Sequence, residues 1–322
     1  MDGRLLFLGL VIGILILAWI GAGVLWRAAE LSEIVAPIDR RTAVELEVVT
    51  VGTGNEYENP ERLGPSTAIV HGETVILVDA GRGIAEGLRS ARIPLDQPAI
   101  VVLTNLLPVN VLGLDDLLFT GWLAARTTPL RVVGPEGTRG LVESLERAHA
   151  AGREALGGAL GLAAPGGRLE VEEVGDGHAF EQGTLRIEAR ALAGGPLPTF
   201  AWRFTAGEHR VVVSGSGWDA DALTRFAASA DVLVHEAAYL PTPEEIAGTG
   251  AEVPHPERLE REAALHTSIL AVGGLARAAQ AARLVLVRLR PPPFFDLQIR
   301  SIVGNDYEGE IVVPKDGDVV YP

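Results

Sequence analysis

The first residues of the chain include an uncharged apolar run, Leu5 to Trp26, flanked by Arg4 and Arg27. A helix needs roughly 20 apolar residues to cross the hydrocarbon core of a bilayer, which is about 30 Å thick. The run meets that length and is too long for the buried helix of a soluble domain. We therefore predict a membrane anchor over residues 1–27 that contacts the membrane through residues 5–26.

A cleaved signal peptide is the alternative interpretation of this run. Its apolar region is typically about 7–15 residues and is followed by a small-x-small cleavage site. Gly21-Ala22-Gly23 fits that site poorly, so an uncleaved anchor is favoured. One arginine on each side says little about orientation. The acidic body after the run favours a single-pass membrane protein whose globular domain is extracytoplasmic, in a bacterium periplasmic.

The charge balance of the 322-residue chain restricts its partners. The formal net charge is −15 and the pI is about 4.9. Proteins that bind nucleic acid usually carry a basic stripe for the phosphates, and none is visible here. A nucleic-acid partner is therefore not expected. With no cysteine, the chain also has no thiolate for a metal site and no disulfide.

Residues 28–43 form a polar stalk, and residues 44–322 have the strand and helix patterns of one α/β domain. Apolar or alternating runs predict strands, and longer periodic runs predict helices. The predicted strands are 44–51, 74–78, 99–103, 130–133, 169–174, 185–191, 199–204, 210–214, 231–234, 284–287 and 310–313. The predicted helices are 83–92, 111–125, 137–160, 220–228 and 267–281. Strand-rich runs with helices in both halves predict two sheets packed face to face with helices outside.

Residues 104–110 read Thr-Asn-Leu-Leu-Pro-Val-Asn and follow the predicted strand 99–103. The flanks of this heptad, and eight further short motifs in order, resemble the ribonuclease Z and arylsulfatase-like branch of the metallo-β-lactamase superfamily. The further motifs are Gly52-Thr-Gly54, Gly64-Pro-Ser-Thr67, Leu77-Val-Asp-Ala-Gly81, Pro129 to Thr138, Ser214-Gly215, Ala230-Asp-Val-Leu-Val-His-Glu-Ala237, His266-Thr-Ser268 and Leu284-Val-Leu-Val287. The resemblance runs from about Val48 to the C-terminus. It implies a four-layer αββα sandwich, here preceded by one transmembrane helix.

The resemblance also implies where metal ligands should stand. Family members have Thr-His-x-His-x-Asp-His after this strand, and family relatives bind zinc. In this chain those four ligand positions are Asn105, Leu107, Val109 and Asn110. The later histidine, the bridging aspartate and the last histidine of the family are matched by Gly194, Ser216 and Arg288.

These replacements predict that no metal cofactor is bound. Zinc takes imidazole, carboxylate or thiolate ligands. An asparagine oxygen is a neutral, hard donor, and leucine and valine donate nothing. Without a metal, water keeps a pKa near 15.7 instead of about 7, so hydroxide is not available at neutral pH. The cation of Arg288 would further repel a metal ion.

Three residues remain as candidates for function. Glu236 and His266 match residues to which the resemblance assigns proton transfer, so they are either a residual acid–base pair or structural residues. Arg288 is predicted to fill the vacated metal space, to pair with Glu236, since buried charges need partners, and to bind an anionic ligand. Leu107 and Val109 should make one wall of a partly closed cavity apolar. A rebuilt metal site of Asp79, Asp219, Glu236 and His266 is the less favoured alternative.

The favoured hypothesis is a membrane-tethered pseudoenzyme with a binding or scaffolding role. The partners it predicts are a second copy of the chain, in a homo-oligomer, or an active relative. The alternative is an active hydrolase of phosphate or sulfate esters, a phosphodiesterase or ribonuclease Z-like enzyme with an atypical site. A third hypothesis, processing of tRNA 3′ ends, is opposed by the acidic charge, the anchor and the absent ligands.

Overall fold

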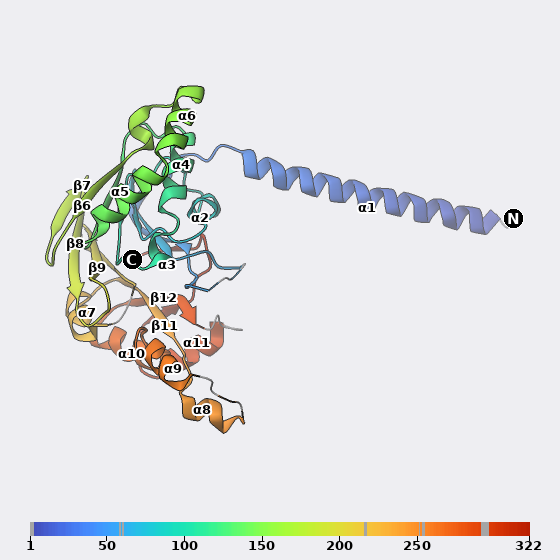
Figure 1. Ribbon diagram of the computed structural model, residues 1–322. Helices are drawn as coiled ribbons and strands as arrows, with labels where there is room; N and C mark the ends of the chain where they lie inside the picture. Colours follow the sequence, from blue (N-terminus) through green and yellow to red (C-terminus); the bar gives the residue numbers. More distant parts are fainter. Residues whose placement is uncertain are drawn as a thin grey trace. The chain divides into compact units, whose positions relative to one another are not determined.

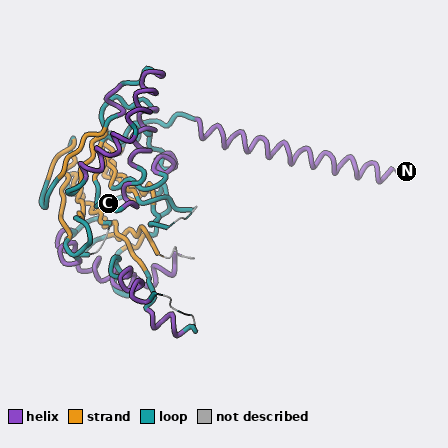
Figure 2. The backbone as a smooth tube through the Cα atoms, viewed as in Figure 1, coloured by secondary structure: helices purple, strands orange, loops and turns teal. Residues whose placement is uncertain are grey.

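The computed structural model describes residues 3–57, 59, 61–215, 218–250, 252, 255–290 and 296–322. Its contacts divide the chain into two compact units, residues 1–39 and residues 40–322. Figure 1 labels the elements, and Figure 2 distinguishes helices from strands. The two units are described separately.

The first unit is a single helix, α1 (Gly3–Val35). Its apolar part, Phe7–Ala29, spans 23 residues with a mean hydropathy of 2.6, and none of its most apolar window is buried against the protein. By length and composition this segment is a candidate membrane span, and an N-terminal signal sequence meets the same criteria. The helix continues through the first half of the predicted stalk and ends at Val35.

The second unit contains two seven-stranded sheets. The first sheet has the order β14-β1-β2-β3-β4-β5-β6, and its strands β3 to β6 are parallel. Its strands are β1 (Ala43–Gly52), β2 (Ser66–Gly72), β3 (Thr74–Val78), β4 (Ile100–Val102), β5 (Leu130–Gly134), β6 (Leu169–Glu173) and β14 (Val319–Val320). The C-terminal strand therefore pairs with the first strand of the domain, Val48 opposite Val320.

The second sheet has the order β13-β12-β11-β10-β9-β8-β7, with β10 to β13 parallel. Its strands are β7 (Ala179–Gln182), β8 (Leu185–Leu192), β9 (Thr199–Ala206), β10 (His209–Ser214), β11 (Val232–Ala238), β12 (Arg283–Arg290) and β13 (Glu310–Val312). Strands β10, β11 and β12 are largely buried, which is typical of parallel strands covered on both faces.

Helices cover the outer face of each sheet (Figure 1). Around the first sheet are α2 (Ile84–Ser90), α3 (Pro108–Val111), α4 (Leu114–Leu123), α5 (Thr138–Ala148), α6 (Ala150–Leu160) and the short 3-10 helix η1 (Ala164–Gly167). On the second half are α7 (Ala220–Phe226), α8 (Pro243–Gly248), α9 (Pro256–Ala263), α10 (Ile269–Ala278) and α11 (Asp296–Val303). The order of layers is therefore αββα, as the resemblance implies.

Three apolar clusters fill the spaces between these layers. One joins residues of both sheets, such as Ile76, Val102, Phe204 and Val234. The other two lie between each sheet and its helices. All three are built from fully buried side chains, so each sheet is apolar on both faces, and the domain is held together mainly by hydrophobic burial.

The predicted elements match the structure with a few differences. Several short elements were not predicted: strands β2, β7 and β14, helices α3, α8, α9 and α11, and the 3-10 helix η1. The predicted helix 137–160 is divided into α5 and α6 at His149. The predicted helix 111–125 begins only at Leu114, because α3 precedes it. Strand β12 extends to Arg290, three residues further than predicted, which places Arg288 inside a strand.

Trp202 in β9 connects the two sheets. Its side chain is fully buried, and its indole Nε1 donates a hydrogen bond to the backbone oxygen of Leu103, 3.0 Å away, directly after β4. Replacing Trp202 by phenylalanine keeps an aromatic ring but leaves that buried oxygen without its donor. We expect the free energy of unfolding to fall by about 2–4 kcal/mol, the sum of the unpaired acceptor and the smaller ring.

Urea denaturation of the full chain in mild detergent measures this loss. The matched control is Tyr321→Phe, because Tyr321 is exposed and its hydroxyl makes no hydrogen bond to any described residue. The control should change stability by less than about 0.5 kcal/mol. Equal effects of the two substitutions would contradict this role of Trp202.

Candidate functional site

The candidate side chains meet where parallel strands of the two sheets end. Asp79 directly follows β3, and Thr104 and Asn105 follow its parallel neighbour β4. In the second sheet Glu236 lies near the end of β11, opposite Val287 of β12, and Arg288 is the next residue. The carboxyl ends of parallel strands are the usual place for a site in open α/β sheets. The fold therefore brings together residues that lie far apart in the sequence.

Arg288 forms an ion pair with Asp79. The guanidinium Nη2 lies 2.6 Å from Asp79 Oδ2, and the two side chains are 10% and 2% exposed. The backbone nitrogen of Thr104 donates to Asp79 Oδ1 over 2.8 Å, and the Thr104 hydroxyl donates to Oδ2 over 2.8 Å. The predicted pair between Arg288 and Glu236 is wrong. Asp79 is the partner because its carboxylate receives several donors at once, which buried ions require.

Burial raises the pKa of the Asp79 carboxyl, and the charge of Arg288 and the two donors of Thr104 oppose that rise. Both carboxyl oxygens of Asp79 act only as acceptors in these hydrogen bonds, so the geometry fits the ionised form of the side chain. The ion pair thus carries no net charge.

The backbone at this pair is unusual. Asp79 has φ of 62° and Arg288 has φ of 54°, a left-handed conformation that residues other than glycine rarely adopt. Gly215 lies against the pair, and a Cβ there would come within 2.8 Å of Thr104 Oγ1 and 3.1 Å of Arg288 Nη2. The guanidinium of Arg288 therefore reaches its position only because Asp79 and Arg288 adopt strained backbone conformations and Gly215 has no side chain. Such strain persists only where the surrounding structure enforces it.

The two asparagines of the heptad hold their own loop. Asn105 Oδ1 accepts hydrogen bonds from the backbone nitrogen of Leu107, at 3.0 Å, and from Asn110 Nδ2, at 2.6 Å. Asn110 Nδ2 also lies 3.2 Å from Thr104 Oγ1. Asparagine commonly stabilises turns in this way. The amide oxygen of Asn105 is therefore already occupied.

Glu236 and His266 form a second pair, as their shared assignment from the resemblance leads one to expect. His266 Nδ1 lies 2.9 Å from Glu236 Oε2, and the backbone nitrogen of Thr267 donates to Glu236 Oε1 over 3.4 Å. Burial alone would lower the pKa of His266, but the hydrogen bond and charge of Glu236, aided by Glu56, raise it above its ordinary value. The carboxylate is 4% and the imidazole 18% exposed.

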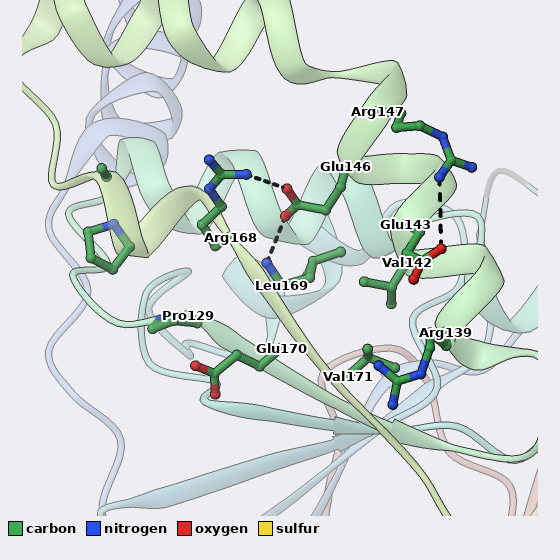
Figure 3. A pocket seen from close by; sticks show the side chains of 12 residues that line it. Pro129, Arg139, Val142, Glu143, Glu146, Arg147, Arg168, Leu169, Glu170 and Val171 are labelled. Carbon is green, nitrogen blue, oxygen red and sulfur yellow. Dashed lines mark hydrogen bonds and ion pairs between the residues drawn. The ribbon is translucent and has the colours of Figure 1, made fainter.

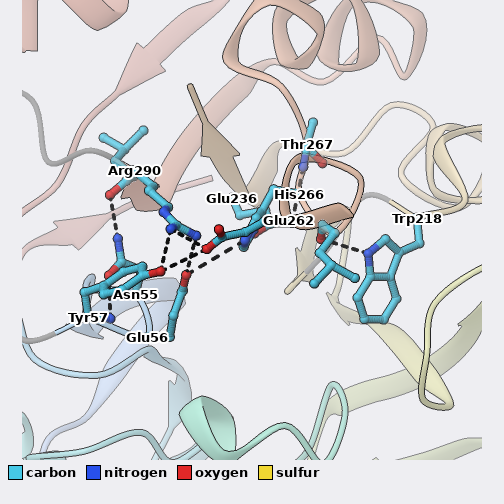
Figure 4. A network of polar contacts seen from close by, with 11 residues as sticks. Asn55, Glu56, Tyr57, Trp218, Glu236, Glu262, His266, Thr267 and Arg290 are labelled. Carbon is cyan, nitrogen blue, oxygen red and sulfur yellow. Dashed lines mark hydrogen bonds and ion pairs between the residues drawn. The ribbon is translucent and has the colours of Figure 1, made fainter. Parts of the chain in front are cut away.

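A polar network at the rim was not predicted (Figure 4). Arg290 Nη1 lies 2.7 Å from Glu56 Oε1, and Arg290 Nη2 lies 2.5 Å from Glu262 Oε1 and 2.6 Å from the Tyr57 hydroxyl. The hydrogen bond from Arg290 lowers the pKa of Glu262. The network joins the loop after β1, the end of β12 and α9. In the sequence, the residues of this network lie far apart among other charged residues. The only pattern that pointed to the network was the alternation of Arg288 and Arg290 at the end of a strand.

A cleft of about 350 Å³ opens between these groups. Its polar lining residues include Asn105, Glu236, His266 and Arg288. Its apolar lining residues are Leu107, Pro108, Val109, Pro196, Trp218 and Leu265. Leu107 and Val109 are half-buried. The predicted apolar wall is therefore present, and it faces a cleft that is still open.

Two of the remaining predicted residues, Gly194 and Asp219, do not line this cleft. Asp219 caps α7, because its Oδ1 accepts from the backbone nitrogen of Ala222 over 2.9 Å. Gly194 has φ of 91° in a turn and does not line the cleft. Ser216 lies outside the described residues. Among the residues that the structure describes, no three His, Cys, Asp or Glu side chains are grouped so as to hold a metal ion.

The chemistry of the cleft does not fit zinc. Leu107 and Val109 have no donor atom, and the oxygen of Asn105 already accepts two hydrogen bonds. The guanidinium of Arg288 supplies a fixed positive charge in the same lining. A zinc ion at the heptad would find no free ligand atom on Asn105, Leu107 or Val109 and would face the guanidinium of Arg288.

A more open hollow of about 780 Å³ lies elsewhere, between α5 and β6 (Figure 3). Four of its charged side chains form ion pairs, with Arg168 Nη1 at 2.8 Å from Glu146 Oε2 and Arg147 Nη1 at 3.8 Å from Glu143 Oε2. No histidine is among its lining residues. The smaller cleft is the better candidate site, because titratable groups from both sheets converge there.

The layers and the place of the site define a metallo-β-lactamase fold. The fold matches the YhfI protein of Bacillus subtilis with a TM-score of 0.65 and human tRNase Z, short form, with 0.62. Each match is 18% identical and covers 86% of this chain and 99% of the other. No family model matches the sequence.

The sequence comparison is more specific. Ribonuclease Z of Mycobacterium bovis (strain BCG / Pasteur 1173P2) is 30% identical over 280 residues, which cover 84% of this chain and 96% of that protein. Ribonuclease Z of Mycobacterium tuberculosis (strain ATCC 25618 / H37Rv) is 29% identical over the same length. The chain belongs to the ribonuclease Z family.

The Arg288–Asp79 pair predicts strong energetic coupling. Arg288→Met should lower the free energy of unfolding by about 3–5 kcal/mol, because it leaves a buried carboxylate without its partner. Combining it with Asp79→Asn should cost clearly less than the sum of the single changes. Urea denaturation of the four forms measures the coupling. Arg147→Met, which removes an exposed pair, is the control and should cost about 0.5 kcal/mol or less. Additive single effects would contradict the pair.

The Glu236–His266 pair predicts a pH-dependent stability. A histidine whose pKa is raised on folding adds stability that is fully present below its unfolded pKa of about 6.5 and is lost as the pH rises through the folded value. His266→Gln should therefore destabilise the protein more at about pH 5.5 than at about pH 9. Urea denaturation at both pH values tests this. In a Glu236→Gln background the difference should shrink, and an unchanged difference there would assign the effect to another group.

Proposed function

We propose that this chain is a non-hydrolytic member of its family, tethered to a membrane by α1, which acts through ligand binding or scaffolding. The observation that carries the proposal is the Arg288–Asp79 ion pair at the strand ends. Metal hydrolases need a site that binds a dication and lowers the pKa of its water. Here the guanidinium of Arg288 lines the cleft at the strand ends, and its positive charge neutralises the carboxylate of Asp79.

The heptad supports the same conclusion. Asn105 Oδ1 and Asn110 Nδ2 make hydrogen bonds within the loop, and Leu107 and Val109 line the cleft as an apolar wall. Seven family ligand positions carry residues that do not bind zinc. The domain nevertheless keeps a cleft of about 350 Å³, within the usual range of roughly 300–1,000 Å³ for small-molecule pockets. Loss of the metal chemistry with retention of the cleft favours binding over catalysis.

Electrostatics oppose an RNA substrate. The chain has a net charge of −15, and Glu56, Glu236 and Glu262 all line the cleft. A phosphate backbone is bound mainly through lysine and arginine. Arg288, which lines the cleft, and Arg290, which contacts the lining residues Glu56 and Glu262, are both paired with carboxylates.

The active-hydrolase alternative has one observation in its favour, the Glu236–His266 pair. A histidine oriented by a carboxylate is a common general acid or base. Such a pair still needs an electrophile or nucleophile, and the described residues of the cleft contain no serine or lysine. Tyr57 hydroxyl is present, but burial and its hydrogen bond with Glu262 raise its pKa, which makes it a poorer nucleophile.

The membrane part of the proposal rests on α1 alone, whose apolar segment has the length of a single span. With the acidic domain after it, the domain lies outside the cytoplasm. A binding subunit of this kind would act beside a second copy of the chain or beside an active relative.

Metal content tests the proposal. The full chain, purified in mild detergent without chelators, should contain far less than one zinc, manganese or iron per chain by elemental analysis. It should also leave bis(p-nitrophenyl) phosphate intact. The control is a mycobacterial ribonuclease Z prepared in the same way. Stoichiometric metal with metal-dependent hydrolysis would refute the proposal, and hydrolysis that is unchanged by chelators but lost in His266→Gln would favour the alternative.

A further inference from the structure

The floor of the cleft is richer in free hydrogen-bond donors than in free acceptors. Within the described residues, Arg288 uses Nη2 for Asp79, and its Nε and Nη1 make no hydrogen bond. Asn105 uses only its oxygen, so its amide Nδ2 is available although the residue is 1% exposed. His266 uses Nδ1 for Glu236, and its Nε2, which donates only when the ring is protonated, is 3.9 Å from Glu56 Oε1.

The acceptors of the floor are mostly occupied. Glu236 Oε2 lies against His266, and its Oε1 accepts from Thr267. The oxygen of Asn105 has two donors. A ligand that covers the floor must pair these donors, because a donor that is buried without a partner is costly. The floor is therefore complementary to a ligand oxygen that accepts several hydrogen bonds.

Charge restricts what carries that oxygen. Asp79 already neutralises Arg288, and the carboxylates of Glu56, Glu236 and Glu262 line the cleft. A dianion such as a phosphate monoester would be repelled by these groups, since like charges a few ångströms apart destabilise each other. A monoanion whose two oxygens match the edge of a guanidinium fits better.

The wall of the cleft determines the rest of the ligand. Leu107, Val109, Trp218 and Leu265 form an apolar surface beside the polar floor. Trp218 is fixed by a hydrogen bond of 2.8 Å from its Nε1 to the backbone oxygen of Leu265. Burial of a hydrocarbon chain against this wall would be favourable by the hydrophobic effect.

We infer that the cleft binds a monocarboxylate with an apolar chain, its carboxylate received by Arg288 and Asn105 and its chain lying on the wall of Leu107, Val109 and Trp218. The inference rests on the proposed function, because it requires the cleft to be free of metal. It names the ligand class of the cleft, which the family relationship does not provide.

Titration of the full chain with decanoate below its micelle concentration tests the inference, followed by calorimetry and by tryptophan fluorescence. We expect saturable binding with one site per chain, and at least tenfold weaker binding of decylamine and of decyl phosphate. Equal binding of all three would show that only the apolar chain is recognised and would overturn the inference. No binding of decanoate would also overturn it.

Substitutions locate the site. Asn105→Asp keeps the acceptor of the loop and turns the free donor into an oxygen, so decanoate binding should fall at least tenfold. Val109→Glu places a carboxylate on the wall and should have a similar effect. Leu112→Glu is the matched control, because Leu112 is 62% exposed and does not line the cleft. A cooperative thermal transition checks folding, and if Asn105→Asp does not fold, Val109→Glu and its control decide the outcome.

The outcome is separable from the proposed function. If metal is absent and decanoate does not bind, the inference fails and the non-hydrolytic proposal stands. If stoichiometric metal and hydrolysis are found, the proposed function fails first, and decanoate binding that requires the metal would overturn the inference as well.

Discussion

The site depends on one buried ion pair, between Asp79 of the first sheet and Arg288 of the second. Removing two charges from water costs several kcal/mol for each ion, and only close contact with extra hydrogen bonds offsets that cost. Here Thr104 donates the extra hydrogen bonds to Asp79. The close contact is possible because Gly215 has no side chain and because Asp79 and Arg288 have left-handed backbone conformations. The pair therefore also fixes the relative position of the strand ends that form the cleft.

Under the proposed function, in which no metal is bound, the same pair keeps the strand ends of the metallo-β-lactamase fold together. In a metal site, a cation between the two sheets is surrounded by anionic and imidazole ligands. Here a guanidinium occupies that role from within the chain, and Asp79 supplies the opposite charge. In the heptad, Asn105 and Asn110 form a hydrogen-bonded turn, and Leu107 and Val109 form an apolar wall.

Much of the fold could be predicted from the sequence, because buried parallel strands such as β4 and β12 are continuous apolar runs. Strand β7 and helix α9 were missed, since one is short and half-exposed and the other is strongly polar. The cleft residues Glu236, His266 and Arg288 were found through the resemblance. The partner of Arg288 was not, because Asp79 lies 209 positions away and no local pattern links the two.

The rim network adds a constraint that follows from the same electrostatics. Arg290 is two residues beyond Arg288 on β12, and it binds Glu56 and Glu262 from two other segments. Strand β12 thus places two guanidinium groups at the cleft. Arg288 is buried beside Asp79, and Arg290 lies at the entrance and pairs with Glu56 and Glu262. A cleft balanced in this way has no excess positive potential for a polyanion, so its selectivity must come from hydrogen bonding and apolar contact. This favours a small amphipathic ligand over RNA as the molecule that the cleft recognises.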